Sequence, residues 1–358
     1  MKTKNVKSKI TKSLILGLIA TLPLSFISCE EDENDDQINI EGIYVVNEGN
    51  FDNNNGSITL FNPDEQETVQ NYFSSNNNWS LGDVVQDLSF YEDKGFIIVN
   101  NSQKVEIVEK ETFESISVIE GLSYPRQFLG INDNKGYITN GSSATGANGN
   151  VFVIDMSDYA FIDTIEVGKG PESMVKYENN VYVTNSGGYS ADNTVSVINT
   201  DNDEVIETIN IKDIPTDIVK DANDNLWVFC KGLGSWQEGG PTNSHLVKIN
   251  TSDNSTTEYE IGKVTSYGNY LLASGPDNET IYYTGADGIY KMEIGANSIP
   301  ETPFIETIPY GLDVNPKNGN IYCMVSGKSS GYAIRYDTES NVIDSTKVGI
   351  SPNAAIFE

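Results

Sequence analysis

The sequence predicts an all-β fold, a seven-bladed β-propeller, from two strand series that run in step and from the way the chain ends. A strand core of a small or apolar, an aromatic and an apolar residue recurs seven times, centred on Tyr44, Phe96, Tyr137, Tyr182, Trp227, Tyr282 and Tyr322. After a polar, Gly-rich stretch, each core is followed by a second alternating run, over residues 57–61, 105–108, 151–154, 195–198, 246–249, 289–292 and 333–336. Two series with the same period indicate a repeat protein.

Two further strands complete each predicted unit. A fourth strand follows the alternating run over residues 161–167, 205–211 and 342–348, often after an Asp or Asn that can turn the chain. The next unit often opens with a proline, whose missing N–H suits the first residue of a strand, at Pro125, Pro171, Pro215, Pro309 and Pro352. Four strands in about 45 residues are the signature of a propeller blade.

The end of the chain predicts how the ring closes. Residues 352–357 have the pattern of a first strand with nothing behind it, whereas the N-terminal unit, which begins at Gly42, lacks a first strand. We therefore expect the two ends to pair in one blade, which brings the blade count to seven and removes exposed sheet edges. The predicted propeller is a single domain over residues 41–358.

Residues 1–28 precede this domain and have the pattern of an export signal. Five lysines within the first twelve residues come before an apolar segment, residues 14–24, that is too short to span a bilayer. With the sequence Phe-Ile-Ser-Cys at residues 26–29 behind it, the segment resembles a bacterial lipoprotein signal, in which Cys29 is lipidated and becomes the mature N-terminus. An ordinary signal peptide with an incidental cysteine is the alternative.

Residues 29–40 are predicted to be a solvated tether, because the acidic run at residues 30–36 can bury nothing. Acidic residues directly after the lipidated cysteine resemble the surface-export signal of lipoproteins in the Bacteroidetes. That resemblance implies a protein of the outer membrane, held there only by its lipid anchor and facing the cell exterior. A periplasmic lipoprotein with an acidic spacer is the alternative.

The overall composition limits the partners that the chain can bind. Its formal net charge is −30, which excludes nucleic acid and argues against anionic ligands, but says little about a neutral ligand. Besides Cys29 the chain contains only Cys230 and Cys323, which lie in different predicted blades. We expect two buried free thiols and no disulfide.

Long, varied loops are predicted on one face of the propeller and short turns on the other. The long segments cover residues 47–56, 72–84, 139–149, 184–193, 229–244 and 324–331. Their aromatic side chains, with those on the blade connections, offer flat apolar surfaces among Asn, Gln and Ser. This composition suits a bulky, neutral, amide- or hydroxyl-bearing ligand lying across the mouth of the ring. The alternative for any single aromatic is packing within its own loop.

The sequence lacks familiar catalytic and metal-binding motifs. His245 is the only histidine, so no site with two imidazoles can form, and no Gly-rich phosphate loop is present. We predict that the protein is not an enzyme and has no catalytic residue, metal site or cofactor. Because some acidic propellers are calcium-dependent lactonases or sugar hydrolases, the carboxylates near the ring centre keep that alternative open: Glu48, Asp87, Glu172, Asp217 and Asp313.

The fourth predicted unit carries the most specific family signal. Its residues 171–175, 181–188 and 193–198 resemble the YVTN repeat of seven-bladed surface propellers, and weaker copies extend from residue 41 to the end. A closer resemblance is to the cobalamin-scavenging propeller lipoproteins that cap vitamin B12 TonB-dependent transporters of gut Bacteroidetes. Besides the lipoprotein signal, it rests on residues 47–51, 53–56, 81–83, 86–87, 125–126, 128 and 185–188.

That resemblance implies a surface protein that captures cobalamin, or another bulky neutral small molecule, on its long-loop face and passes it to a TonB-dependent outer-membrane transporter. A glycan-binding propeller and an adhesive or structural surface protein are the alternatives. The candidate ligand-binding residues are Asn47, Asn50, Phe51, Trp79, Asp87, Tyr124, Arg126, Asn185, Tyr189, Lys231, Trp236, Tyr267 and Tyr310.

Overall fold

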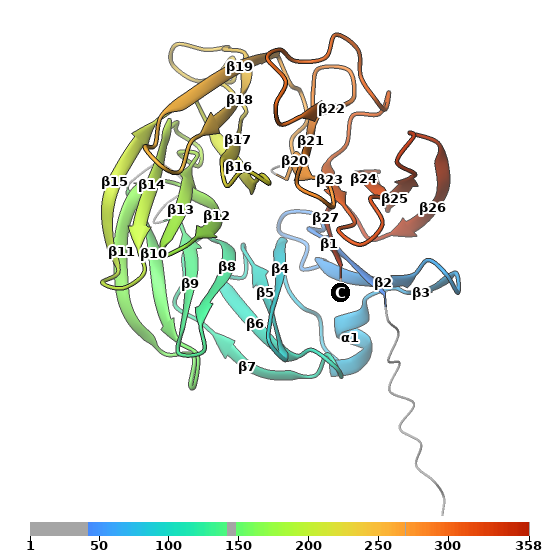
Figure 1. Ribbon diagram of the computed structural model, residues 1–358. Helices are drawn as coiled ribbons and strands as arrows, with labels where there is room; N and C mark the ends of the chain where they lie inside the picture. The colour runs from blue at the N-terminus through green and yellow to red at the C-terminus, as the bar shows by residue number, and fades with distance from the viewer. Residues whose placement is uncertain (1–41, 142–147, 269, 358) are drawn as a thin grey trace, which may run out of the picture. The chain divides into compact units, whose positions relative to one another are not determined.

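The structure is a computed structural model that describes residues 42–141, 148–268 and 270–357. This part of the chain forms a ring of seven antiparallel sheets (Figure 1) and lies within one compact unit, Ile38–Glu358. The predicted signal segment 1–28, the lipidated Cys29 and the tether 29–40 lie outside the described residues. No helix in the described ranges is long and apolar enough to cross a bilayer.

Each sheet is one blade, and its strands follow one another from the centre of the ring outward (Figure 1). Blades one and two contain β27 (Pro352–Phe357), β1 (Ile43–Asn47), β2 (Ser57–Asn62) and β3 (Glu67–Val69), then β4 (Val85–Tyr91), β5 (Lys94–Val99), β6 (Lys104–Glu109) and β7 (Ser115–Ile119). Blades three and four contain β8 (Pro125–Asn132), β9 (Lys135–Asn140), β10 (Asn148–Asp155) and β11 (Phe161–Lys169), then β12 (Pro171–Tyr177), β13 (Asn180–Asn185), β14 (Thr194–Asn199) and β15 (Glu204–Asn210).

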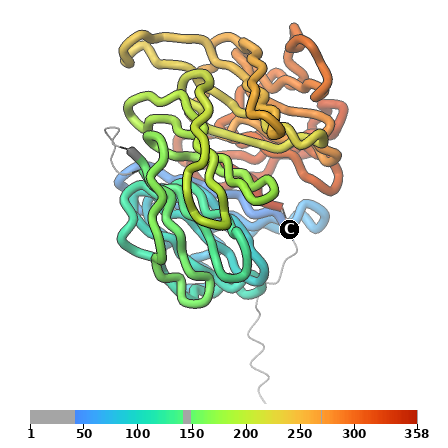
Figure 2. The backbone as a smooth tube through the Cα atoms, turned by 60° about the vertical axis from the view of Figure 1, so that its left-hand side comes forward, coloured from blue at the N-terminus to red at the C-terminus, as the bar shows by residue number. Residues whose placement is uncertain are grey.

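The remaining blades complete the ring. They contain β16 (Pro215–Lys220), β17 (Leu226–Cys230), β18 (Ser244–Ile249) and β19 (Thr256–Gly262) in blade five; β20 (Leu272–Ser274), β21 (Thr280–Thr284) and β22 (Ile289–Glu293) in blade six; and β23 (Gly311–Val314), β24 (Ile321–Val325), β25 (Gly331–Tyr336) and β26 (Val342–Val348) in blade seven. Figure 2, turned so that the left-hand side of Figure 1 comes forward, follows the backbone from blade to blade.

Strand β27 closes the ring by pairing with β1. The register places Tyr44 opposite Ile356 and Val45 opposite Ala355, so residues from both ends of the propeller share blade one. Because β1 also pairs with β2, both of its edges are covered. The pairing confirms the predicted closure and the seven-bladed fold.

The apolar core lies between adjacent blades, and the recurring strand motif supplies it. All seven aromatic centres of the motif are buried. Phe96 of blade two stacks on Phe128 of blade three with ring centroids 3.7 Å apart, and burial of one such ring contributes about 2 kcal/mol. Cys230 and Cys323 are buried free thiols in separate core clusters, as expected.

Blade six departs from the predicted four-strand pattern. Its sheet has three strands, and an isolated bridge between Ile289 and Ile305 occupies the position of the fourth. The segment around this bridge contains Pro300 and Pro303, which lack the N–H that a strand ladder needs. Pro309, which was expected to open the next blade, lies in the same irregular segment, and β23 begins at Gly311.

Helix α1 (Tyr72–Asn77) lies within the segment 72–84 that was expected to be a long loop. Its Tyr72 and Phe73 are buried in the core cluster that joins blades one and two. In Figure 1 the helix lies on the outer side of the ring. Much of this segment is therefore a packed connection between blades.

Candidate functional site

Five inner strands change register directly after their first residue, and this irregularity shapes the mouth of the ring. We call the residue after the strand's opening residue its first inner position and the next residue its second inner position. The pairing skips the first inner position alone in β27, β4 and β16, where the skipped residues are Asn353, Gln86 and Thr216. In β8 and β12 it skips the first and second inner positions, Arg126 and Gln127, and Glu172 and Ser173. A β-bulge of this kind frees a residue from the strand ladder and re-aims its side chain.

A cleft of about 820 Å³ is lined by three of these first inner positions, Arg126, Glu172 and Thr216. Arg126 is fixed by two neighbours. Its Nε donates to Glu172 Oε2 at 2.6 Å, and its Nη1 donates to Gln86 Oε1 at 2.8 Å. Together with Lys231, which also lines the cleft, these three lining residues form what we call the floor.

Lys231 directly follows β17 and makes the cleft locally basic. Its Nζ donates to the carbonyl oxygen of Tyr267 at 3.2 Å. Burial, partly opposed by the charge of Glu172, lowers the pKa of Lys231 to about 8. Among the lining residues, Arg126, Lys231 and Lys263 are basic and Glu172 is the one acid. The net charge of −30 therefore does not argue against an anionic ligand in this cleft.

Four aromatic side chains stand exposed around the cleft, and we call them the rim. Phe51, Tyr189, Trp236 and Tyr267 line the cleft and are between 62% and 88% exposed. Tyr124 lines it as well but is half-buried. Exposed rings of this size are the usual stacking surfaces for a flat ligand.

The loops that carry the rim are tied to each other by hydrogen bonds. Gln237 Nε2 donates to the carbonyl oxygen of Ser190, which connects the loops of blades five and four. Lys263 Nζ donates to the carbonyl oxygens of Leu233 at 2.7 Å and Thr242 at 3.1 Å. A loop that is already ordered loses less conformational entropy when a ligand binds.

At the second inner positions of β16 and β23, carboxyl side chains bond to the next blade. Asp217 Oδ2 accepts hydrogen bonds from the backbone N–H groups of Leu271 and Leu272, both at 3.0 Å. Asp313 Oδ2 accepts one from the backbone N–H of Ala355 at 2.8 Å. These carboxylates join the inner strands of neighbouring blades.

Burial raises the pKa of each of these inner carboxyl groups. The pKa of Asp217 rises to about 7 and that of Asp87 to about 6, while that of Asp313 rises well above its ordinary value. The Ser89 hydroxyl donates to Asp87 Oδ2 at 2.8 Å. The hydrogen bonds that these carboxylates accept lower their pKa values, and the effect of burial exceeds them.

The structure brings seven of the thirteen candidate ligand-binding residues together in the cleft lining. They are Phe51, Tyr124, Arg126, Tyr189, Lys231, Trp236 and Tyr267. The remaining six candidates lie outside that lining: Asn47, Asn50, Trp79, Asp87, Asn185 and Tyr310.

Two of the outlying candidates are buried asparagines that brace strands. Asn47 Nδ2 donates to the Ser57 carbonyl oxygen at 3.1 Å, and Asn185 Nδ2 donates to Ser196 Oγ at 3.0 Å. Both lie at the end of a second strand, β1 and β13. Their amides therefore join the second strand of the blade to the third.

The other outlying candidates also have local partners. Tyr310 donates from its hydroxyl to Glu48 Oε2 at 2.5 Å. Trp79 is 52% exposed and packs edge-on against Phe73 of α1. Asn50 is exposed and uses its backbone N–H to bond the side chain of Asn55 at 2.7 Å.

Sequence reasoning missed several residues that line the cleft. Thr216, Lys263 and Gln237 were not among the candidates, and Glu172 was considered only as a possible catalytic carboxylate. A signal for two of them was present, because Glu172 and Thr216 directly follow prolines that open blades. Lys263 and Gln237 lie in irregular segments whose path the repeat pattern does not determine.

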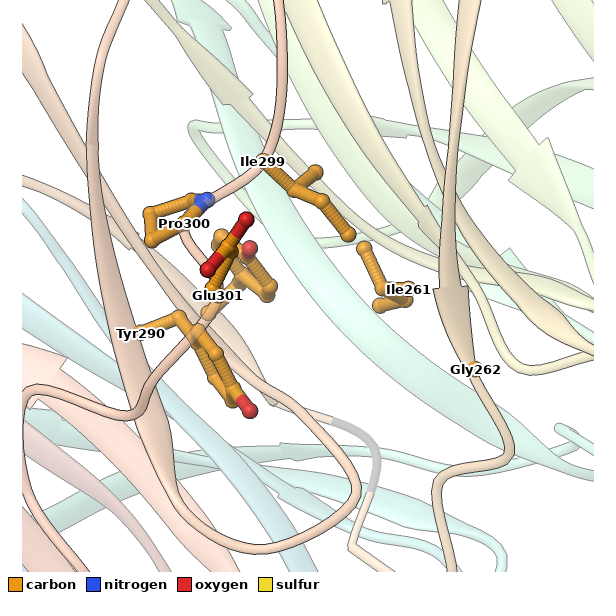
Figure 3. Close-up of a pocket in the computed structure, with 7 residues that line it drawn as sticks. Ile261, Gly262, Tyr290, Ile299, Pro300 and Glu301 are labelled. Atoms are coloured by element: carbon orange, nitrogen blue, oxygen red, sulfur yellow. The ribbon is translucent and has the colours of Figure 1, made fainter.

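A second cavity, of about 360 Å³, lies at the junction of blades five and six (Figure 3). It is lined by Ile261, Gly262, Tyr283, Tyr290, Ile299, Pro300 and Glu301. The last three come from the irregular segment that replaces the fourth strand of blade six. The cavity is therefore explained by incomplete packing around the missing strand, and its lining contains no cation.

Comparisons with known proteins agree on the fold and leave the function open. Residues 41–348 match the family described as a domain of unknown function, DUF5074. No curated protein matches the chain. Similar solved structures include a quinonprotein alcohol dehydrogenase-like protein from Bacteroides thetaiotaomicron (TM-score 0.67, 15% identity, 88% of this chain and 78% of that one).

Two further solved structures are similar to this chain in fold and carry different names. Hydrazine synthase from Kuenenia stuttgartiensis matches with a TM-score of 0.59 and 13% identity over 92% of this chain and 100% of that one. BamB from Moraxella catarrhalis matches with a TM-score of 0.50 and 12% identity over 75% of this chain and 76% of that one. At such low identity the likeness concerns the fold alone.

Proposed function

The chain belongs to the DUF5074 family, and we propose that it is a non-catalytic surface lipoprotein that captures a bulky ligand in the long-loop cleft and passes it to a TonB-dependent outer-membrane transporter. Cobalamin is the ligand that we place first. The observation that carries the proposal is the cleft of about 820 Å³, with four exposed aromatic side chains at its rim and a polar floor. Small-molecule sites typically measure about 300–1,000 Å³ and combine apolar walls with a few polar groups.

The chemistry of cobalamin suits this arrangement. Its corrin is a flat macrocycle fringed with amides, so rim rings can cover its face while polar side chains bond its edge. Ser186, Ser235 and Gln237 line the cleft and offer such bonds. A glycan would use the same two features, which makes it the alternative that an experiment must separate.

We propose a non-catalytic protein because of the surroundings of the carboxylates near the ring centre. Asp217 and Asp313 accept backbone hydrogen bonds, and Asp87 accepts one from Ser89. Glu172 is paired with Arg126. A carboxylate already engaged in this way is poorly placed to act as a base or nucleophile on a ligand.

Calorimetric titration of the full chain in detergent with cyanocobalamin tests the proposal. We expect saturable one-to-one binding that Trp236→Ala weakens by about tenfold, because stacking on an aromatic ring contributes about 0.5–1.5 kcal/mol beyond the apolar area that it buries. Trp79→Ala is the matched control, since Trp79 is also exposed but lies outside the cleft lining.

Two results would contradict the proposal in different ways. Equal losses from both tryptophan variants would mean that the ligand does not use the cleft. A flat titration would reject cobalamin, and an oligosaccharide array would then test the glycan alternative.

A further inference from the structure

One buried hydroxyl of the floor and one buried amide beside the floor have no hydrogen-bond partner among the described residues. Thr216 is 2% exposed and lines the cleft, yet its hydroxyl makes no hydrogen bond there. Gln86, also 2% exposed, lies outside the cleft lining; it gives its Oε1 to Arg126 of the floor, while its Nε2 has no acceptor in the same part of the chain. Leaving one such group unpaired costs about 1–3 kcal/mol. The Thr216 hydroxyl can donate, so an acceptor bound in the cleft would satisfy it.

Two cations lie beside these donors. Arg126 and Lys231 both belong to the floor, and the one acid of the lining, Glu172, already accepts from Arg126 Nε. Burial lowers the pKa of Lys231, although the charges of Glu172, Glu48 and Asp217 act in the opposite direction. An anion placed on the floor would lie beside both cations and would accept a hydrogen bond from Thr216.

We propose that the floor is a subsite for an anionic oxygen group of the ligand, a phosphate or a carboxylate. Arg126 and Lys231 supply the charge and Thr216 supplies a hydrogen bond. Charge-assisted hydrogen bonds of this kind are about twice as strong as neutral ones. The subsite can be tested with a simple anion, so its existence does not depend on the proposed function. Only the identity of the whole ligand rests on the proposed function. The phosphodiester of cobalamin and the carboxylate of an acidic sugar both belong to this class.

Inorganic phosphate is the probe that tests the subsite by itself. A ligand that binds only the folded state raises the melting temperature Tm. We expect phosphate to raise the Tm of the full chain in detergent by about 2 °C more than sodium chloride of equal ionic strength. Lys231→Met should lose this difference, and Lys231→Arg should keep most of it because the charge remains.

Lys220→Met is the matched control for loss of a positive charge. Lys220 ends strand β16, whose other end supplies Thr216, and it pairs with Asp224 away from the cleft lining. It should leave the phosphate effect unchanged. If Lys231→Met kept the full phosphate effect, or if phosphate and chloride had the same effect on the unsubstituted chain, the subsite would be refuted.

Cobinamide, which lacks the phosphodiester and nucleotide of cobalamin, identifies the source of the anion. Lys231→Met should weaken cyanocobalamin binding by about tenfold and change cobinamide binding by less than about twofold. Equal losses for both ligands would refute the assignment of the phosphodiester to the floor. If neither corrinoid bound while phosphate still required Lys231, the proposed ligand would be wrong and the subsite would stand, and acidic sugars would be the next probes.

Discussion

The first and second inner positions are neighbours in each inner strand, yet their side chains contact different parts of the molecule. At the first position, Arg126 and Glu172 pair with each other in the cleft. The side chain of Thr216 lines the cleft and has no hydrogen-bond partner among the described residues. At the second position, Asp217 bonds to the backbone of the next blade. Because successive strand residues point to opposite sides and a bulge frees the first of them, adjacent polar residues acquire separate roles.

This division of roles between neighbouring residues lets the ring be both stable and open to a ligand. Gln127, at the second inner position of β8, accepts a hydrogen bond from the backbone N–H of Met174 at 2.5 Å. Its neighbour Arg126 is part of the floor. In β8 and β16 the inner strand thus bonds to the next blade with one residue and faces the cleft with the residue before it.

The largest expected effect is on stability, from Asp217→Ala. This change leaves the buried N–H groups of Leu271 and Leu272, and that of Ile218 at 2.9 Å from Oδ1, without their acceptor. At about 1–3 kcal/mol for each unpaired group, the free energy of unfolding should fall by about 4 kcal/mol. Urea denaturation followed by circular dichroism measures it.

Glu120→Ala is the control for that change, since Glu120 is an exposed acid at the end of the fourth strand of blade two. It should alter the free energy of unfolding by less than about 0.5 kcal/mol. If Asp217→Ala were equally mild, the second inner positions would not be what joins the blades.

A comparable effect is expected from pH, and Asp217→Asn reveals it. Burial raises the pKa of Asp217 to about 7 in the folded chain, so between about pH 4 and pH 7 the folded state holds a proton that the unfolded state has lost. The stability from this group is complete below pH 4 and is lost as the pH rises through 7. Asparagine does not titrate, so the free energy of unfolding of the unsubstituted chain, relative to Asp217→Asn, should fall by about 4 kcal/mol from pH 4 to pH 8.

Urea denaturation of both proteins across this pH range gives the difference directly. Lys231 is the charged neighbour that also acts on Asp217, so the measurement is repeated in Lys231→Met. A difference that rose with pH would mean that Asp217 is ionised in the fold and stabilised by its donors.

The repeat pattern predicts most of the fold because each blade meets the same physical demand. A buried aromatic at the centre of every second strand packs between blades, and the motif around Tyr182 or Trp227 is visible in the sequence for that reason. Blade six escaped the prediction, because an isolated bridge at Ile305 replaces a strand and the segment's prolines do not repeat elsewhere.

The site was only partly predictable from the sequence, because β-bulges in the inner strands decide which side chains face the cleft. Aromatic side chains on long loops, such as Trp236, stand out in the sequence, and they line the cleft. A β-bulge has no sequence signature of its own here, so the sequence does not tell which acid faces the cleft: Glu172, one residue after Pro171, or Asp217, two residues after Pro215. Only the pairing shows that one faces the cleft and the other a neighbouring backbone.

The smallest expected effect on stability comes from Glu172→Gln, which tests a first inner position. The change removes the one acid of the cleft lining while an amide oxygen can still accept from Arg126. Because no backbone N–H of the described residues donates to this carboxylate in the way that those of Leu271 and Leu272 donate to Asp217, the stability loss should stay well below that of Asp217→Ala. Removing one negative charge beside Arg126 and Lys231 should strengthen phosphate binding by about fivefold, measured from the phosphate dependence of Tm. Weaker phosphate binding would mean that Glu172 positions Arg126 for the anion, and the first inner positions would then act as one fixed unit.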